Sequence, residues 1–474
     1  MKKYDIVIGL EIHAELNTNS KVFCSCKNEF GAEPNTQVCP VCLGLPGALP
    51  VLNKKAVEST IKAGLSLGCE INDIAVFERK NYFYPDLSKA YQISQLQKPI
   101  CLHGGITLDS GKFVRLNRIH LEEDAGKLTH ISHTVGTYVD YNRGGVPLIE
   151  IVTEPDISSA DEAVEFVTKL RQTLIYSGVA NCKMEQGGLR CDVNLSIKEQ
   201  DSVVLGTRVE MKNLNSFKSI HRAIEYEAHR QIDELNKGNT IKQQTRGWDD
   251  NKGRNYTMRE KEDANDYRYF PDPDLLTVVI SRDEVERLRT ELPEGINDRK
   301  QRYLKLGLSE YDANILTSEK IISNYFDEVL NITDEPKETA NWVMTDVLRV
   351  YKESVGIDSL NDIITASQLA EVIKLVLNKE ISRPNSKVLF DEIVKTGKEV
   401  SVLLKELELV GTVDTEDIVN IIENIITNNP KIIDDYKEEP GDITNYFIGS
   451  IMRLTGGKAN VNKARMLITE RLNK

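Results

Sequence analysis

The chain has 474 residues, of which 40% are hydrophobic and 28% are charged. This composition is typical of folded globular proteins, and the length predicts two or three domains. A net charge of −13 argues against a uniformly basic nucleic-acid-binding protein, although a few clustered Lys or Arg side chains still suffice to bind phosphates. No apolar run reaches the roughly 18 residues that span a bilayer, and the N-terminus lacks a signal-peptide pattern. We therefore expect a cytoplasmic protein without a membrane partner.

Residues 6–16 alternate between apolar and polar side chains, which predicts a β-strand with two different faces. The apolar face comprises Ile6, Ile8, Leu10 and Ile12, and the polar face comprises Glu11, His13 and Glu15. A Glu-x-His pair on one strand face is suited to bind a divalent cation or a phosphate-bound Mg²⁺. Taken alone, the pattern more often indicates a polar face turned to solvent.

Four cysteines follow in two close pairs, with the spacing CxC, twelve residues, then CxxC. They are Cys24, Cys26, Cys39 and Cys42. Two such pairs predict a structural, tetrahedral Zn²⁺ site. The alternatives are four reduced thiols or a redox CxxC motif, but a redox motif needs a thioredoxin-like βαβ context that the sequence lacks. The other cysteines, Cys69, Cys101, Cys182 and Cys191, are scattered, and we interpret them as core residues.

Three further segments, 147–155, 189–197 and 207–213, alternate in the same way. Their polar faces carry Glu150, then Arg190, Asp192 and Asn194, then Arg208, Glu210 and Lys212; residues 120–124 add a cluster of carboxylates. If these strands share a sheet, their polar faces would form one concave site. Carboxylates would hold Mg²⁺ there, and cationic side chains would hold phosphates, as phosphoryl transfer requires. The sequence contains no Walker A motif and no Gly-x-Ser-x-Gly motif.

Helical patterns separate and follow these strands. Ser158 or Ser159 is expected to cap a helix that ends near Gly178, and Ser216 a helix that ends at Gly238. After residues 292–295, which we interpret as a hinge, the pattern becomes helical throughout. We therefore predict three domains, at 1–294, 295–410 and 411–474.

The end of the chain is basic, although the whole chain is acidic. From Arg453 onward there are six basic residues against Glu470 alone: Arg453, Lys458, Lys463, Arg465, Arg471 and Lys474. Solvated helix faces and an RNA-facing patch are equally good interpretations of this pattern.

Nine segments, in this order, resemble the B subunits of aspartyl/glutamyl-tRNA amidotransferases, the GatB family. They are residues 9–13, 79–86, 91–95, 120–127, 147–150, 154–156, 189–194, 212–216 and 266–274. No single segment would be specific, but together they are. The resemblance implies an α+β, cradle-like catalytic domain with a mixed or antiparallel sheet, followed by an all-helical domain and a small helical tail domain.

The resemblance also implies an activity and partners. Members of this family work in a heterotrimer with an amidase, which releases ammonia from glutamine, and a small third subunit. The B subunit uses ATP to phosphorylate the side-chain carboxylate of Glu-tRNA(Gln) or Asp-tRNA(Asn), and ammonia then displaces the phosphate. The expected enzyme is thus a glutamine-hydrolysing, ATP-dependent ligase.

Site residues follow from the family's pattern. The Mg²⁺ ligands map to Glu11, His13, Glu123 and Glu150. Glu122 is the alternative to Glu123, because strand parity places it on the same face as His120. Contacts with ATP, the acyl phosphate or ammonia map to Lys80, Arg190, Asp192, Glu210 and Lys212. The four-cysteine pattern resembles the zinc-bearing form found in part of this family.

The tail departs from the family's pattern. Many relatives carry a Lys-rich run before the last helices, where this chain has KEEPGDIT at residues 437–444; residues 447–452 still match. Carboxylate activation is therefore better supported than the way the tail binds tRNA.

Two other functions compete with this interpretation. One is an ATP-dependent carboxylate kinase or ligase for a small-molecule acid, against which the basic tail and the motif series argue. The other is a tRNA-binding assembly protein whose catalytic site has decayed. Such a site would be expected to lose charged residues that have no structural role, yet all five are present: Glu11, His13, Glu123, Glu150 and Asp192.

Overall fold

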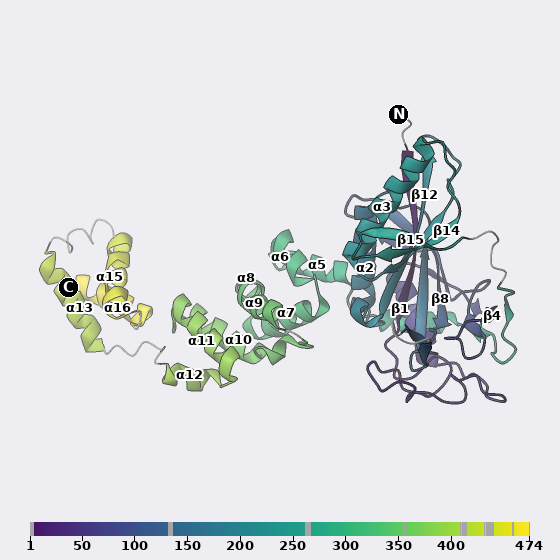
Figure 1. Ribbon diagram of the computed structural model, residues 1–474. Helices are drawn as coiled ribbons and strands as arrows, with labels where there is room; N and C mark the ends of the chain where they lie inside the picture. The colour runs from purple at the N-terminus through teal and green to yellow at the C-terminus, as the bar shows by residue number, and fades with distance from the viewer. Residues whose placement is uncertain are drawn as a thin grey trace. The chain divides into compact units, whose positions relative to one another are not determined.

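The computed structural model describes residues 4–130, 136–260, 267–354, 356–407, 409, 415–430, 432, 440–456 and 459–473. The chain divides into two compact units, residues 1–296 and 297–474. Figure 1 shows a large sheet in the first unit and helices in the second. Among the described residues, no helix has the length and apolar character needed to cross a membrane.

A ten-stranded sheet forms the centre of the first unit, with β1 (Tyr4–Glu15) in its middle. The order is β15 (Arg254–Glu260), β14 (Gln244–Asp249), β13 (Val209–Leu214), β12 (Leu189–Glu199), β1, β11 (Pro147–Thr153), β8 (Phe113–Glu123), β6 (Cys101–Leu102), β2 (Glu70–Ile71), with β7 (Gly105–Thr107) also paired to β8. All pairs are antiparallel except β13 and β14, so the sheet is mixed. The expected α+β class with a mixed sheet is confirmed.

Helices cover the apolar face of this sheet. Ile8, Leu10 and Ile12 of β1 are fully buried in a core that also contains residues of α1 (Lys54–Ser66), α2 (Ala160–Tyr176) and α3 (Phe217–Asn236). Each buried side chain of this size contributes about 1.5–3 kcal/mol relative to exposure. α2 and α3 lie side by side in Figure 1. Because the helices occupy one face, the polar face of β1 is turned to the other side.

The helix starts agree with the predictions. The Ser159 hydroxyl accepts a hydrogen bond from the Glu162 N–H at the start of α2, and the Ser216 hydroxyl accepts one from Ser219 N–H at the start of α3. Such caps satisfy N–H groups that have no partner within the helix.

Three small sheets complete the first unit. They are β16 (Phe270–Pro271) with β4 (Glu78–Asn81) and β5 (Tyr91–Ser94), β9 (Lys127–His130) with β10 (Thr137–Asp140), and β17 (Val278–Val279) with β3 (Ile74–Ala75); α4 (Arg282–Thr290) ends the unit. Arg79 of β4 binds Asp272 and Asp274, at 2.8 and 2.9 Å. These ion pairs tie the segment that follows residue 266 to β4. Asp266, the first residue of the family-like segment 266–274, lies outside the described residues.

The second unit is helical and contains two separate hydrophobic clusters, one within residues 303–403 and one within 418–472. Its α-helices are α5 (Ile296–Lys305), α6 (Glu310–Leu316), α7 (Lys320–Thr333), α8 (Pro336–Trp342), α9 (Leu348–Glu353), α10 (Ala366–Leu377), α11 (Arg383–Thr396), α12 (Val400–Glu406), α13 (Thr415–Asn428), α15 (Pro440–Leu454) and α16 (Val461–Leu472). The helical character predicted for this part is confirmed. Lys458, Lys474, and residues 411–414 and 437–439 of the predicted tail lie outside the described residues.

Candidate active site

The polar faces of neighbouring strands meet across the middle of the sheet. In register, His13 of β1 pairs with Arg190 of β12 on one side and Glu150 of β11 on the other, and Glu150 pairs with His120 of β8. Residues paired in register point to the same face of a sheet. The strands that the sequence singled out are therefore adjacent, and their charged side chains form one continuous row.

One end of this row holds a group of potential metal ligands. Donor atoms of His13, Glu122 and Glu150 all lie within 4.8 Å of one another. The Nε2 atom of His13 lies 3.3 Å from a Glu150 oxygen and 3.7 Å from a Glu122 oxygen. Two carboxylates and one imidazole form a donor set that suits a divalent cation.

Electrostatics keep these carboxylates charged. Burial would raise the pKa of Glu150, but the neighbouring imidazoles of His120 and His13 hold that pKa well below its usual range. Burial would likewise lower the pKa of His13, but the hydrogen bond and charge of Glu150, with the charge of Glu122, raise it. The group is negatively charged overall, as a cation site requires.

The structure places Glu122, not Glu123, in this group. The Glu122 carboxylate also accepts a hydrogen bond from the Ser94 hydroxyl at 2.9 Å. Glu123 instead binds Lys89 at 2.5 and 2.6 Å and accepts a hydrogen bond from the Ile93 N–H. Glu123 therefore lies outside the ligand group, in an ion pair that the sequence did not indicate.

Lys80 interacts electrostatically with the same group, although its strand, β4, belongs to a different sheet. Burial would lower the pKa of Lys80, but the charges of Glu122, Tyr269 and Glu150 raise it well above its usual range. Its ammonium lies 5.0 Å from the centre of the Tyr267 ring. A positive charge is thus held beside the carboxylates.

A second charged group lies on β12 and β13. Lys212 binds Asp192, and it binds Glu210 at 3.0 Å. Glu11 pairs with Asp192 in register and accepts a hydrogen bond from Asn194 at 2.9 Å. Burial, and then the nearby charges of Glu150 and Glu210, raise the pKa of Glu11. Glu11 thus lies between the two groups, but it is not part of the ligand group around His13.

Arg190 is the remaining predicted site residue. It lies beside His13 in register, but its guanidinium binds Asp124 at 2.5 Å. Asp124 also lies 3.4 Å from Arg143. Asp124 therefore fixes Arg190 at the edge of the polar row.

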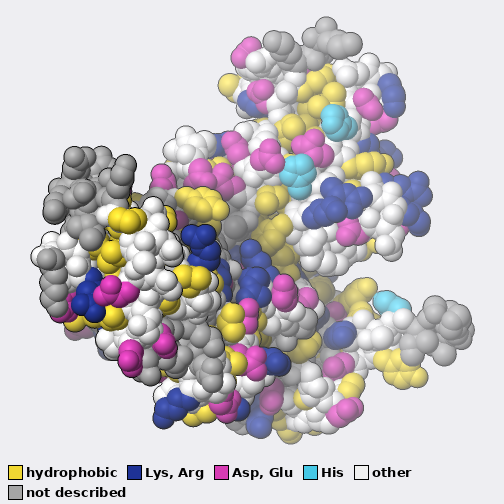
Figure 2. All heavy atoms as spheres, turned by 90° about the vertical axis from the view of Figure 1, so that its left-hand side faces the viewer, with side chains coloured by type: hydrophobic (Ala, Val, Ile, Leu, Met, Phe, Trp, Pro, Cys, Tyr) yellow, Lys and Arg dark blue, Asp and Glu magenta, His cyan; other side chains and the backbone are white. Residues whose placement is uncertain are grey.

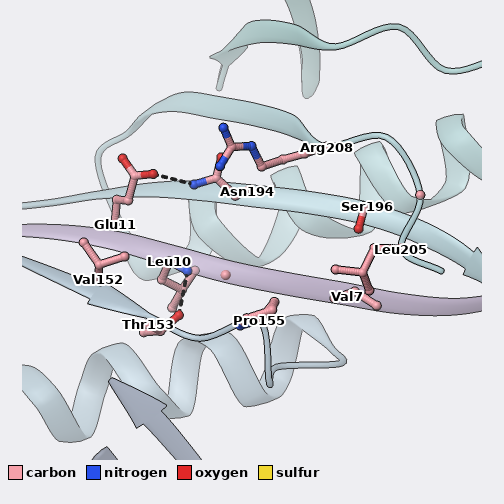
Figure 3. A pocket seen from close by; sticks show the side chains of 12 residues that line it. Val7, Leu10, Glu11, Val152, Thr153, Pro155, Asn194, Ser196, Leu205 and Arg208 are labelled. Atoms are coloured by element: carbon pink, nitrogen blue, oxygen red, sulfur yellow. Dashed lines mark hydrogen bonds between the residues drawn. The ribbon is translucent and has the colours of Figure 1, made fainter. Parts of the chain in front are cut away.

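A pocket of about 260 Å³ opens beside Glu11 on the same face of the sheet. Figure 3 shows Glu11, Asn194 and Arg208 at one end, and Val7 and Leu205 at the other. Gly9 lies on its floor between β11 and β12, and no heavy atom lies closer than 3.9 Å to the place of an added Cβ. The pocket therefore has a charged end next to the polar row and an apolar end away from it.

The four cysteines of the first loop also come together. The sulfur atoms of Cys24, Cys26, Cys39 and Cys42 all lie within 4.8 Å of one another. A tetrahedral ion bound by four thiolates at about 2.3 Å needs sulfur atoms about 3.8 Å apart. The Cys39 and Cys42 sulfurs are 3.8 Å apart. The arrangement thus fits one tetrahedral ion.

Together, the mixed sheet, its charged face and the helical second unit define an α+β catalytic domain joined to a helical region. Residues 6–286 match the family described as GatB/GatE catalytic domain, and residues 324–472 match the family described as GatB domain. The chain therefore belongs to the GatB family.

Named relatives are similar over the whole chain. The B subunit of the aspartyl/glutamyl-tRNA(Asn/Gln) amidotransferase of Caldicellulosiruptor bescii is 49% identical, with 100% of both chains covered. The protein of the same name from Thermoanaerobacter pseudethanolicus is 47% identical, again over 100% of both chains. That from Thermodesulfovibrio yellowstonii is 46% identical, with 98% of each chain covered.

Two residues of the site had no role assigned from the sequence. Lys89 lies in a loop segment without periodicity, and only the folded chain brings it to Glu123. His120 was used only to judge strand parity, yet its Nε2 atom lies 3.4 Å from Glu122 and 3.5 Å from Glu150. His120 lies two residues before Glu122 on the same strand, and this spacing, which places both side chains on one face, could have predicted its role.

Proposed function

We propose that this chain is the carboxylate-activating component of a tRNA-dependent amidotransferase. It works with an amidase and a small third subunit on Glu-tRNA(Gln), Asp-tRNA(Asn) or both, in the cytoplasm, where these tRNAs are made and used. The observation that carries the proposal is the ligand group of His13, Glu122 and Glu150, faced by Lys80, in a chain of this family.

The reaction has two steps. A side-chain carboxylate oxygen of the misacylated tRNA attacks the γ-phosphorus of ATP, and ADP leaves. Ammonia then attacks the carbonyl carbon, inorganic phosphate leaves, and the nitrogen loses a proton to give the amide. The first step is needed because oxide is a poor leaving group, whereas phosphate is a good one.

The chain's residues supply charge and position. His13, Glu122 and Glu150 would hold Mg²⁺, which when bound neutralises charge on the phosphates. Lys80 adds a positive charge on the side of Glu122 and Glu150. Lys212, held between Asp192 and Glu210, is a second cation on the same face of the sheet. We assign both lysines to phosphate or acyl-phosphate contacts.

We propose that the pocket beside Glu11 takes the nucleoside of ATP. Its apolar end, with Val7 and Leu205, suits a base, and its charged end lies next to the ligand group, where the phosphates must be. Arg208 is exposed and has no ion pair with the described residues. It is therefore available to a phosphate or ribose.

The Arg208→Ala substitution tests this placement. We expect the KM for ATP to rise about tenfold, the loss of about 1.4 kcal/mol of binding, with kcat within about twofold of wild type, because Arg208 would contact ATP away from the reacting atoms. Steady-state kinetics at saturating tRNA measure both constants. Arg259→Ala, an exposed arginine of β15, is the control. An unchanged KM for ATP would place the nucleoside elsewhere.

We propose Zn²⁺ as the ion of the four-cysteine site. Four thiolates without a carboxylate or a free position form a donor set of the structural zinc type. The Cys42 carbonyl accepts a hydrogen bond from the Ser88 hydroxyl at 2.7 Å. Lys89, which follows Ser88 in the chain, binds Glu123. The loop would thereby support β8 close to Glu122.

We propose that the second unit comprises two domains, 295–410 and 411–474, in agreement with its two hydrophobic clusters. Arg453, Lys463 and Arg465 of the final part are exposed, as a role in tRNA binding would require. On the face drawn in Figure 2, basic side chains are interspersed with acidic ones. Contact with tRNA would therefore use local groups of Lys and Arg.

Reconstitution tests the proposed function. The full chain, purified with its two partner proteins, should convert Glu-tRNA(Gln) or Asp-tRNA(Asn) to the amide with ATP, Mg²⁺ and glutamine. Ammonium chloride should replace glutamine but not ATP. If amide still formed from ammonium after Glu11→Ala and Glu150→Ala together, or formed without ATP, the proposed site would be wrong.

A further inference from the structure

His120 contacts both carboxylates of the ligand group without belonging to it. Its side chain is 3% exposed, and its Nε2 atom lies 3.4 Å from a Glu122 oxygen and 3.5 Å from a Glu150 oxygen. The mutually close donor atoms are those of His13, Glu122 and Glu150. His120 therefore lies next to the candidate metal site and contacts both of its carboxylates.

The other ring nitrogen shows which way the imidazole donates. The Arg118 Nε atom donates to the His120 Nδ1 atom at 3.4 Å. A guanidinium has only donors, so Nδ1 must accept. In the neutral ring, the single proton then lies on Nε2 and points toward the two carboxylates. A protonated Nε2 offers them a donor and offers a metal ion no lone pair.

We propose that His120 is a positioning residue for the metal site, which holds Glu122 and Glu150 in place, and that Arg118 fixes its tautomer. The inference rests on the metal site of the proposed function. Two buried carboxylates repel each other, and a donor shared between them limits both the repulsion and their rotation. Neighbouring groups of this kind commonly change metal affinity 10–100-fold when they are replaced.

Metal binding gives a test that needs neither ATP nor tRNA. The full chain in complex with its partner proteins is titrated with Mn²⁺, and free Mn²⁺ is measured by electron paramagnetic resonance. We expect His120→Leu to raise the Kd for Mn²⁺ about 10–100-fold, because the donor is lost. His120→Gln should stay within about threefold of wild type, because the amide can still donate.

Arg118 provides a variant outside the core. Arg118→Gln should raise the Kd for Mn²⁺ by a smaller factor, about three- to tenfold, since only the control of the tautomer is lost. Arg115→Gln is the matched control: Arg115 lies three residues earlier on β8, and its guanidinium binds Asp156 at the surface. In the amidation assay, His120→Leu and Arg118→Gln should raise the Mg²⁺ concentration for half-maximal rate and leave kcat at saturating Mg²⁺ near wild type, whereas His120→Gln should resemble wild type.

Three results would overturn the proposal. One is a Kd for Mn²⁺ in His120→Leu within twofold of wild type. Another is an equal, large loss in His120→Leu and His120→Gln with Arg118→Gln unchanged, which would make His120 a direct ligand. A third is a lower melting temperature in all variants with unchanged Mn²⁺ affinity, which indicates packing alone. If wild type bound no Mn²⁺, the metal site of the proposed function would fail as well.

Discussion

Glu150→Gln is expected to lower kcat for amidation by about 10²–10³-fold, equivalent to about 3–4 kcal/mol of transition-state stabilisation. Glu150 belongs to the ligand group, and its carboxylate lies 3.3 Å from the His13 Nε2 atom and 3.5 Å from the His120 Nε2 atom. The positive charge of Lys80 also acts on it. The amide keeps the shape of the side chain and removes its negative charge. Steady-state assays with ammonium chloride measure the loss without interference from the glutaminase step.

Glu154→Gln is the matched control for this variant. Glu154 lies one residue beyond the end of β11, and its carboxylate accepts a hydrogen bond from Asn117 at a solvent-exposed position. Its kcat should stay within about twofold of wild type. A Glu150→Gln protein that folds like wild type and retains more than a third of its kcat would contradict the proposed role of Glu150.

Loss of the four-cysteine site should have the largest effect on stability. Cys39→Ser with Cys42→Ser is expected to reduce bound zinc from about one per chain to none. It should lower the melting temperature by about 6–12 °C, the shift that a loss of about 3 kcal/mol causes in a domain of this size. Residues 16–53 contain turns, bends and one isolated bridge but neither a helix nor an extended strand. Because this loop has so little regular secondary structure of its own, the bound ion would be its main source of stability.

Elemental analysis and differential scanning calorimetry test both parts of this prediction. Ser25→Ala, an exposed residue between two of the cysteines, controls for substitution in the loop. Removal of zinc from wild type by a chelator should reproduce the lower melting temperature. Zinc-free wild type with an unchanged melting temperature would show that the site has no structural role.

Local periodicity was sufficient to predict the two faces of the central strands. In β1, the alternation of Ile8, Leu10 and Ile12 with Glu11 and His13 follows directly from the pleat of a strand, and burial of the apolar set fixes which face is which. The N-caps of α2 and α3 are also local, because the serine side chain bonds a nearby N–H.

Contacts between distant segments could not be read from the sequence. Glu122 and Glu123 are adjacent, and the choice between them depends on the pairing of β8 with β11, which places His120 opposite Glu150. Lys80 reaches the ligand group from another sheet, and Lys89 reaches Glu123 from a loop. Such contacts form only when the backbone folds, and no periodic pattern in the sequence indicates them.

The most direct test of the account follows an oxygen atom. Misacylated tRNA with ¹⁸O in the side-chain carboxylate is incubated with the complete enzyme, ATP, Mg²⁺ and ammonium chloride, and the products are analysed by mass spectrometry. Phosphorylation of the carboxylate predicts ADP and inorganic phosphate that contains one ¹⁸O atom for each amide formed. Appearance of ¹⁸O in AMP, or unlabelled phosphate, would contradict it.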